Sequence, residues 1–208
     1  MKKLNLFMKD AYVVLHNVLS TPSLLSSMAK FGYNEKRVKE SMERLQLIKQ
    51  IALLRNEAIS LSKSTTRNLQ IAKETLISLF QIHIETARLG FKREAEYEDH
   101  LNICNRRKSG TIDWLEQAET FYASVPTPMM EKYNVTAEEL AQARQLVSQV
   151  MDLLAAQSKA KSRVQELTKQ RNQQTEILDK WMRDFMKVAS VALGESPQQL
   201  EALNKVVP

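Results

Sequence analysis

Residues 136–193 read TAEELAQARQLVSQVMDLLAAQSKAKSRVQELTKQRNQQTEILDKWMRDFMKVASVAL and contain neither glycine nor proline. Alanine, leucine, glutamine, glutamate, lysine and arginine dominate this stretch, and all of them favour the helical conformation. Thr136, with Glu139 three positions later, forms the capping-box pattern of a helix N-terminus. Gly194 follows directly, and a glycine there can adopt the left-handed conformation that ends a helix. The stretch predicts either one very long helix or two helices joined by a turn.

The first half of the chain contains a stretch of the same kind, residues 35–89, which also lacks glycine and proline. Asn34 can cap its N-terminus, and Gly90 follows its end. The whole sequence of 208 residues has only 4 glycines and 5 prolines, too few for a fold with many tight turns. We therefore predict an all-α protein.

The second half of the sequence looks like a diverged copy of the first, mainly in the class of residue at each position. At an offset of 102 residues, Met28-Ala29-Lys30-Phe31 aligns with Met130-Glu131-Lys132-Tyr133. Near the start the offset is about 107, which aligns Ala11-Tyr12 with Ala118-Glu119. Further apolar pairs at the offset of 102 are Val38 and Leu140, Leu45 and Val147, Ile48 and Val150, Leu76 and Leu178, Phe80 and Met182, Ala87 and Ala189, Phe91 and Leu193, and Leu101 and Leu203. The matched positions are core-forming, and none of them is chemically reactive.

The matched segments predict a tandem duplication, with one copy in residues 1–107 and the other in residues 108–208, packed together as one structural unit. Each copy is expected to contain two short helices, a long helix and a final short helix. We expect the two long helices to pack antiparallel. The expected first and final short helices cover residues 4–19 and 94–101 in the first copy, and 112–123 and 198–203 in the second.

The apolar stripe of the long stretches is strong at both ends and weak in the middle, where residues 157–174 offer only Ala160, Val164 and Leu167. Each stretch could fold back as a hairpin near residues 60–66 and 158–162, which would give a compact four-helix bundle. Alternatively both helices run on continuously, as in coiled coils and helical repeats. We favour the continuous helices, because only the first copy has a Ser/Thr cluster that could form a turn.

The positive charge of the chain is concentrated in its first half. The net charge is +6, and residues 1–107 contain 18 lysines and arginines against 11 aspartates and glutamates. A polyanion-binding module is therefore the alternative function, since basic clusters neutralise phosphates. Its candidate nucleic-acid-binding residues are Lys92, Arg93, Arg106, Arg107 and Lys108. The low aromatic content, 6%, and the lack of a recognition-helix motif argue against it.

The histidines give only a weak indication of a metal site. Glu96 and His100 are four residues apart, so they can share a helical face and form half of a site. A ferritin-like di-metal centre needs Glu-x-x-His motifs, but the residue three before His100 is Tyr97. The position equivalent to His100 in the second copy is Ala202. A metal protein is thus a third alternative only, and no cofactor is predicted.

No set of catalytic residues stands out, so we predict a protein that is not an enzyme. Cys104 lacks the base and orienting group that an activated nucleophile requires. Phosphate-binding loops of the Gly-x-Gly-x-x-Gly and Gly-x-x-x-x-Gly-Lys types are absent.

The same features predict a soluble, cytoplasmic protein. A single cysteine excludes an intramolecular disulfide and fits a reducing compartment. Met1-Lys2-Lys3 resembles the start of a signal peptide, but Lys9, Asp10 and His16 interrupt the apolar segment that should follow. No apolar run is long enough to span a membrane.

Large aromatic side chains at Trp114, Trp181, Phe185 and Phe80 are predicted to anchor the ends of the helical bundle. Several segments around them resemble uncharacterised bacterial all-helical proteins built from two such repeats. The segments that carry the resemblance are Trp114–Ala118, Lys132–Leu140, Phe31–Asn34, Trp181–Phe185 and Pro197–Leu203. The resemblance implies the repeated architecture and no activity.

Repeated core positions without repeated reactive residues favour a non-catalytic helical scaffold or protein-interaction protein. Long paired helices offer an extended surface for a partner helix or for self-association. We expect a protein partner rather than a small molecule or a membrane.

Overall fold

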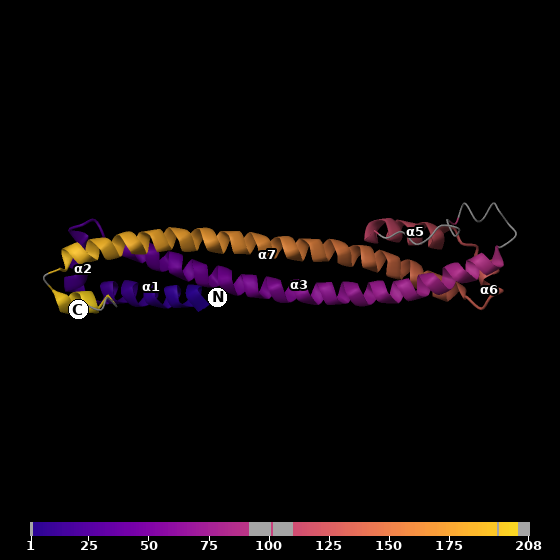
Figure 1. The fold of residues 1–208 in the computed structure, drawn as a ribbon, viewed down its shortest axis with the longest axis horizontal. Coiled ribbons are helices and arrows are strands. Elements are labelled where there is room, and N and C mark those ends of the chain that lie inside the picture. The colour runs from indigo at the N-terminus through magenta and orange to yellow at the C-terminus, as the bar shows by residue number, and fades with distance from the viewer. Residues whose placement is uncertain (1, 92–100, 102–109, 195, 204–208) are drawn as a thin grey trace. The chain divides into compact units, whose positions relative to one another are not determined.

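The computed structural model describes residues 2–91, 101, 110–194 and 196–203. These residues form seven helices and no strand (Figure 1), which confirms the predicted all-α fold. The helices are α1 (Lys2–Ser20), α2 (Pro22–Ala29), α3 (Glu35–Gly90), α5 (Thr111–Ser124), α6 (Thr127–Glu131), α7 (Ala137–Ala192) and α8 (Pro197–Glu201). Except for Leu101, the short helix predicted at residues 94–101 falls outside the described ranges.

Helices α3 and α7 are continuous, with 56 residues each. The favoured prediction of long helices is confirmed, and the alternative of two hairpins is wrong. The Ser/Thr cluster does not break α3 because its hydroxyl groups bond to carbonyls of the preceding turn. Thr65 Oγ1 donates to Leu61 O at 2.9 Å, and Thr66 Oγ1 donates to Ser62 O at 2.8 Å. Hydroxyls satisfied in this way are compatible with a helix interior.

The chain forms two compact units, each built from segments that are distant in sequence. The first unit comprises residues Met1–Ala58 and Arg163–Pro208, and the second comprises Ile59–Ser162. The predicted boundary between the two sequence copies, at residues 107 and 108, falls inside the second unit. The two sequence copies and the two compact units therefore divide the chain at different residues, because each unit contains part of both long helices.

The first unit packs α1, α2 and α8 against the N-terminal part of α3 and the C-terminal part of α7. Arg44 Nη1 donates to Gln174 Oε1 at 2.5 Å, and Arg55 Nε donates to Thr168 Oγ1 at 2.7 Å. The partner number falls as the α3 number rises, so the two helices are antiparallel here. The largest fully buried side chains of this core are Leu15, Leu24, Met28, Leu45, Ile48 and Phe185.

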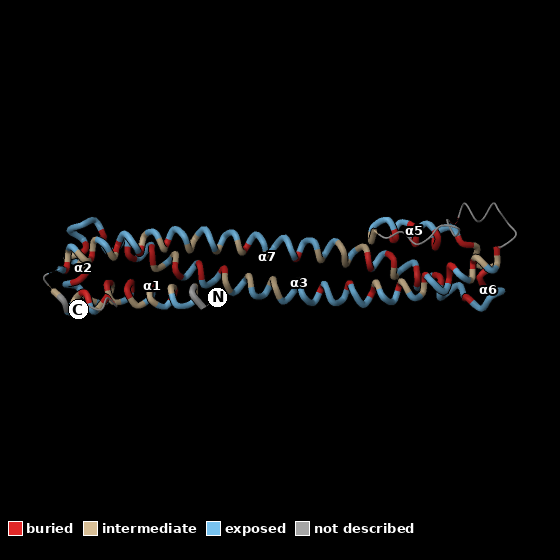
Figure 2. The backbone as a smooth tube through the Cα atoms, in the orientation of Figure 1, coloured by how far each residue is buried: buried red, intermediate tan, exposed pale blue. Residues whose placement is uncertain are grey.

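The second unit packs α5 and α6 against the C-terminal part of α3 and the N-terminal part of α7. Gln157 Nε2 donates to Thr66 Oγ1 at 3.1 Å, and Lys73 Nζ donates to Thr111 Oγ1 at 3.1 Å. The largest fully buried side chains of its core are Tyr122, Phe91, Phe121, Leu76 and Leu101. Figure 2 shows buried and exposed residues alternating along both long helices, as expected of amphipathic helices.

Positions 102 residues apart adopt the same conformation at the turns that precede the long helices. Gly32 has φ +84° and Asn134 has φ 63°, the left-handed region that both residue types tolerate. The next residue closes each turn: Tyr33 N donates to Met28 O at 3.2 Å, and Val135 N donates to Met130 O at 3.1 Å. All eight apolar pairs matched in the sequence are buried on both sides.

The long helices begin with the predicted caps. In α7 the Glu139 amide donates to Thr136 Oγ1 at 3.2 Å, while the Thr136 amide donates to Glu139 Oε2 at 2.8 Å. At the start of α3 the Arg37 amide donates to Asn34 Oδ1 at 3.1 Å. These bonds satisfy amides that a helix N-terminus otherwise leaves unpaired.

Candidate functional site

The four predicted aromatic anchors lie in or against the two cores. In the second unit, Phe80 and Trp114 are buried and pack edge to face, with ring centroids 6.1 Å apart. In the first unit, Phe185 is fully buried and stacks on the half-buried Trp181 at 5.0 Å. Edge-to-face and stacked aromatic pairs stabilise a core beyond the area that they bury.

The predicted metal and nucleic-acid residues lie outside the described ranges. This applies to Glu96, His100 and Cys104, and to the basic residues Lys92, Arg93, Arg106, Arg107 and Lys108. Among the residues that the structure does describe, no group of three or more His, Cys, Asp or Glu side chains could hold a metal ion. No helix in these ranges is both long and apolar enough to cross a lipid bilayer.

His83 and Tyr122 form a buried polar pair in the second unit. His83 Nδ1 lies 3.0 Å from Tyr122 Oη, and the rings meet edge to face with centroids 5.7 Å apart. The exposed fractions are 3% for His83 and 1% for Tyr122. The matched positions in the first unit hold Phe185 and Leu15, so this pair is specific to the second unit.

Burial governs the protonation of both groups. It lowers the pKa of His83, although the charge of Glu139 on α7 acts in the opposite direction. It also raises the pKa of the Tyr122 hydroxyl. Both rings are therefore neutral near pH 7, and Tyr122 Oη pairs with Nδ1 of the imidazole. Since both side chains are almost entirely buried, we interpret the pair as a structural contact rather than an acid–base site.

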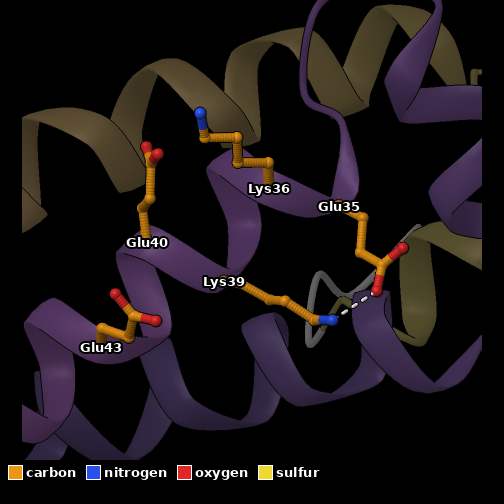
Figure 3. A pocket seen from close by; sticks show the side chains of 5 residues that line it. All are labelled: Glu35, Lys36, Lys39, Glu40 and Glu43. Carbon is orange, nitrogen blue, oxygen red and sulfur yellow. Dashed lines mark ion pairs between the residues drawn. The ribbon is translucent and has the colours of Figure 1, made fainter.

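The first two turns of α3 carry a shallow surface depression of about 490 Å³. Figure 3 shows its five side chains: Glu35, Lys36, Lys39, Glu40 and Glu43. Lys39 Nζ pairs with Glu35 Oε1 at 2.6 Å, and both side chains are exposed. Exposed ion pairs of this kind contribute about 0–1 kcal/mol. Charges of both signs are mixed here and do not converge on a common point (Figure 3), so the depression has no features of a binding site.

Two other hollows have apolar linings. One lies in the first unit between α1 and α7, has a volume of about 500 Å³, and is lined by Phe7, Val14, Met182, Met186 and their neighbours. The other, here called the α5–α7 groove, lies in the second unit and measures about 670 Å³. Its lining residues are Ile112, Leu115, Glu116, Glu119, Met151, Leu154, Ala155, Gln157, Ser158 and Lys161.

Sequence reasoning did not identify the α5–α7 groove. Each of its helices is amphipathic in the sequence, but periodicity does not tell which helices meet or how closely their side chains fill the space between them. One residue could have served as a signal. Ile112, in the first turn of α5, is apolar but does not belong to the buried residues of that helix, and it is 68% exposed in the structure.

Comparison of the chain with models of protein families, with curated proteins and with solved structures found no match.

Proposed function

We propose that this protein is a non-catalytic helical scaffold that binds another protein, or a second copy of itself, through exposed faces of its long helices. The architecture supports this proposal, because the core positions recur at a fixed sequence offset while reactive side chains do not. The same proposal includes two further points: the chain resembles bacterial two-repeat helical proteins, and it is located in the cytoplasm.

The observation that carries the proposal is the apolar character of the outer side of α3. In the first unit, Leu47, Leu53 and Leu54 are 42%, 64% and 46% exposed. Isolated exposed apolar residues are ordinary on protein surfaces. Leu47 and Leu54, however, are seven residues or about two helical turns apart on one face of α3, and Leu53 lies beside that face, about 100° further round the helix. In the second unit the same helix exposes Leu61, Ile71, Ile82 and Leu89.

Site-specific photo-crosslinking tests the proposal. A benzophenone amino acid in place of Leu53 should form one discrete covalent product in the cells that make the protein. The same amino acid in place of Asn56, which is exposed one turn further along α3, should form none. Leu47→Ser and Leu54→Ser should abolish the product formed at position 53, because they remove the apolar face beside it.

Gln46→Ser is the matched control, since Gln46 is exposed next to Leu47 but polar. It should leave the product unchanged. Equal labelling from positions 53 and 56, or labelling that ignores the two leucine substitutions, contradicts the proposal. A product that contains nucleic acid would instead favour the polyanion-binding alternative, whose support is the excess of basic residues in the first half of the chain.

A further inference from the structure

The α5–α7 groove has the dimensions of a short helix. Its lining extends over residues 112–119 of α5 and residues 151–161 of α7. At about 1.5 Å per residue, the longer side runs for roughly 15 Å, or three turns of an α-helix. Leu115 is buried at its base, Met151 and Leu154 are half-buried, and Ile112 is exposed at one end. Apolar side chains thus form a continuous strip that no described element covers.

In the first unit a side-chain contact bridges the equivalent place. There α1 takes the role of α5, and the sequence offsets match Tyr12 with Glu119 and Lys49 with Met151. Lys49 Nζ lies 4.9 Å from the centre of the Tyr12 ring, so the two side chains bridge α1 and α3. Neither partner of this bridge is present in the second unit, where the groove remains open.

The charges beside the groove indicate what it can accept. Asp113, Glu116 and Glu119 recur at intervals of three residues on α5, and all three are exposed. Within the described part of the chain, Glu116 and Glu119 form no ion pair. Lys161 is the one basic residue of the lining and lies on α7, at the end remote from residue 151. An occupant would therefore meet apolar contacts along the middle and carboxylates along the α5 side.

We propose that the α5–α7 groove binds an amphipathic helix of a partner protein, whose apolar face is flanked by lysine or arginine residues that pair with Glu116 and Glu119. This inference rests on the proposed function as an interaction protein and adds the site and the chemistry of the partner. Helix-in-groove recognition uses apolar anchors at spacings of three and four residues. Complementary charges at the rim select the partner and its orientation.

The probe is a synthetic amphipathic peptide of leucine and lysine, about 18 residues or five helical turns long, with leucines at helical spacing. Fluorescence anisotropy of the labelled peptide, titrated with the intact chain at physiological salt, should show saturable binding at one site per chain. Glu116→Gln with Glu119→Gln should weaken binding by about tenfold, since each carboxylate loses a pairing in a partly desolvated groove. A peptide with glutamate in place of lysine should not bind.

Glu40→Gln with Glu43→Gln is the matched control. These glutamates have the same spacing on an exposed helical face, lie in the first unit (Figure 3), and undergo the same change of charge. The control should leave the affinity within about twofold. Equal weakening by both pairs of substitutions overturns the inference, because it would show a general electrostatic attraction rather than a site.

A second variant tests the shape of the groove. Glu119→Tyr with Met151→Lys installs the residues that bridge the equivalent place in the first unit, so peptide binding should be lost. Circular dichroism should show an unchanged helical content and melting temperature, which excludes misfolding. Retained binding would overturn the inference. Concentration-dependent self-association that this variant abolishes would also overturn it, by showing that a second copy occupies the groove.

The two proposals can fail independently. Crosslinking from Leu53 without peptide binding at the groove would retain the scaffold function and reject the groove. Peptide binding that follows the predicted variants, without crosslinking from Leu53, would retain the groove and reject the outer face of α3 as the binding surface.

Discussion

At the scale of single residues, the contact between His83 and Tyr122 is the clearest departure from an apolar core. The hydrogen bond of 3.0 Å joins α3 and α5, and both side chains are nearly inaccessible to solvent. Burial disfavours the protonated form of such a histidine, because a charged ring loses the stabilisation that bulk water provides. Its protonation state is thereby coupled to the folding of the second unit.

The stability of the second unit should depend on pH through His83. Burial lowers the pKa of His83 from its ordinary value of 6.5, so the unfolded chain binds a proton more readily than the folded chain does. The contribution of neutral His83 to the stability of the second unit is complete above pH 6.5, and it is lost as the pH falls from there toward the lowered pKa. Each unit of difference in pKa corresponds to about 1.4 kcal/mol.

Thermal unfolding measured between about pH 8 and pH 5 checks this expectation. His83→Phe with Tyr122→Leu introduces the residue types of the matched positions in the first unit, and it should remove the decrease in melting temperature between these pH values. His16→Asn, at an exposed histidine, should preserve the decrease. A decrease that is the same in the double variant and in the original protein would assign the pH dependence to other groups.

At the scale of elements, the turns before α3 and α7 show how much the sequence specified. The capping box at Thr136, the cap at Asn34 and the left-handed residues Gly32 and Asn134 are local features, because the donors, acceptors and dihedral angles belong to neighbouring residues. Such features can be read from a single sequence. The same is true of the eight apolar pairs that recur after 102 residues, whose members are all buried.

Features that depend on two distant segments could not be predicted. His83 and Tyr122 are 39 positions apart, and helical periodicity does not indicate that their helices meet. The Ser/Thr cluster was ambiguous for a different reason: hydroxyl groups satisfy backbone carbonyls inside a helix as well as in a turn. The openness of the α5–α7 groove depends on which side chains bridge it, and the sequence comparison alone does not show that Tyr12 and Lys49 do so in the first unit.

The turn before α3 should tolerate asparagine better than alanine at position 32. Gly32 has φ +84°, and a Cβ atom there would come no closer than 3.6 Å to Arg37 Nη1, so the penalty arises from the backbone rather than from crowding. Gly32→Ala should lower the free energy of unfolding by about 1 kcal/mol, and Gly32→Asn by less. Asn134→Ala, at the equivalent turn before α7, should lower the free energy of unfolding by a similar amount.

Chemical denaturation of these variants gives the free energies. Asn134→Gly serves as the control, because glycine adopts this conformation without strain and should leave the stability equal or slightly higher. If Gly32→Ala and Gly32→Asn are equally stable, the left-handed conformation is not what fixes the residue type at this turn.

At the scale of the whole molecule, each compact unit has a core of its own while sharing two continuous helices with the other. A cavity in one core should therefore destabilise the elements packed on that core first. Phe80→Ala should lower the free energy of unfolding of the second unit by about 3–5 kcal/mol. Hydrogen exchange should show faster opening of α5, with α1 unaffected; Phe185→Ala should produce the reverse.

If either substitution reduces protection against hydrogen exchange in both α1 and α5, the two units unfold as one cooperative entity. Restriction of the effect to one unit would show two regions of separate stability within a single chain.

The division into two units has a consequence for folding during synthesis on the ribosome. The second unit is one continuous segment, residues 59–162, whose core partners are all present once that segment has emerged. The first unit joins residues 1–58 to residues 163–208, so its early helices must wait for the synthesis of residues 163–208 before its core is complete. During that interval the apolar faces of α1 and α2 lack their partners on α7 and α8, and exposed apolar surface of this kind is prone to aggregation. The order of synthesis thus makes the middle of this chain its first folded part and the two flanks its last.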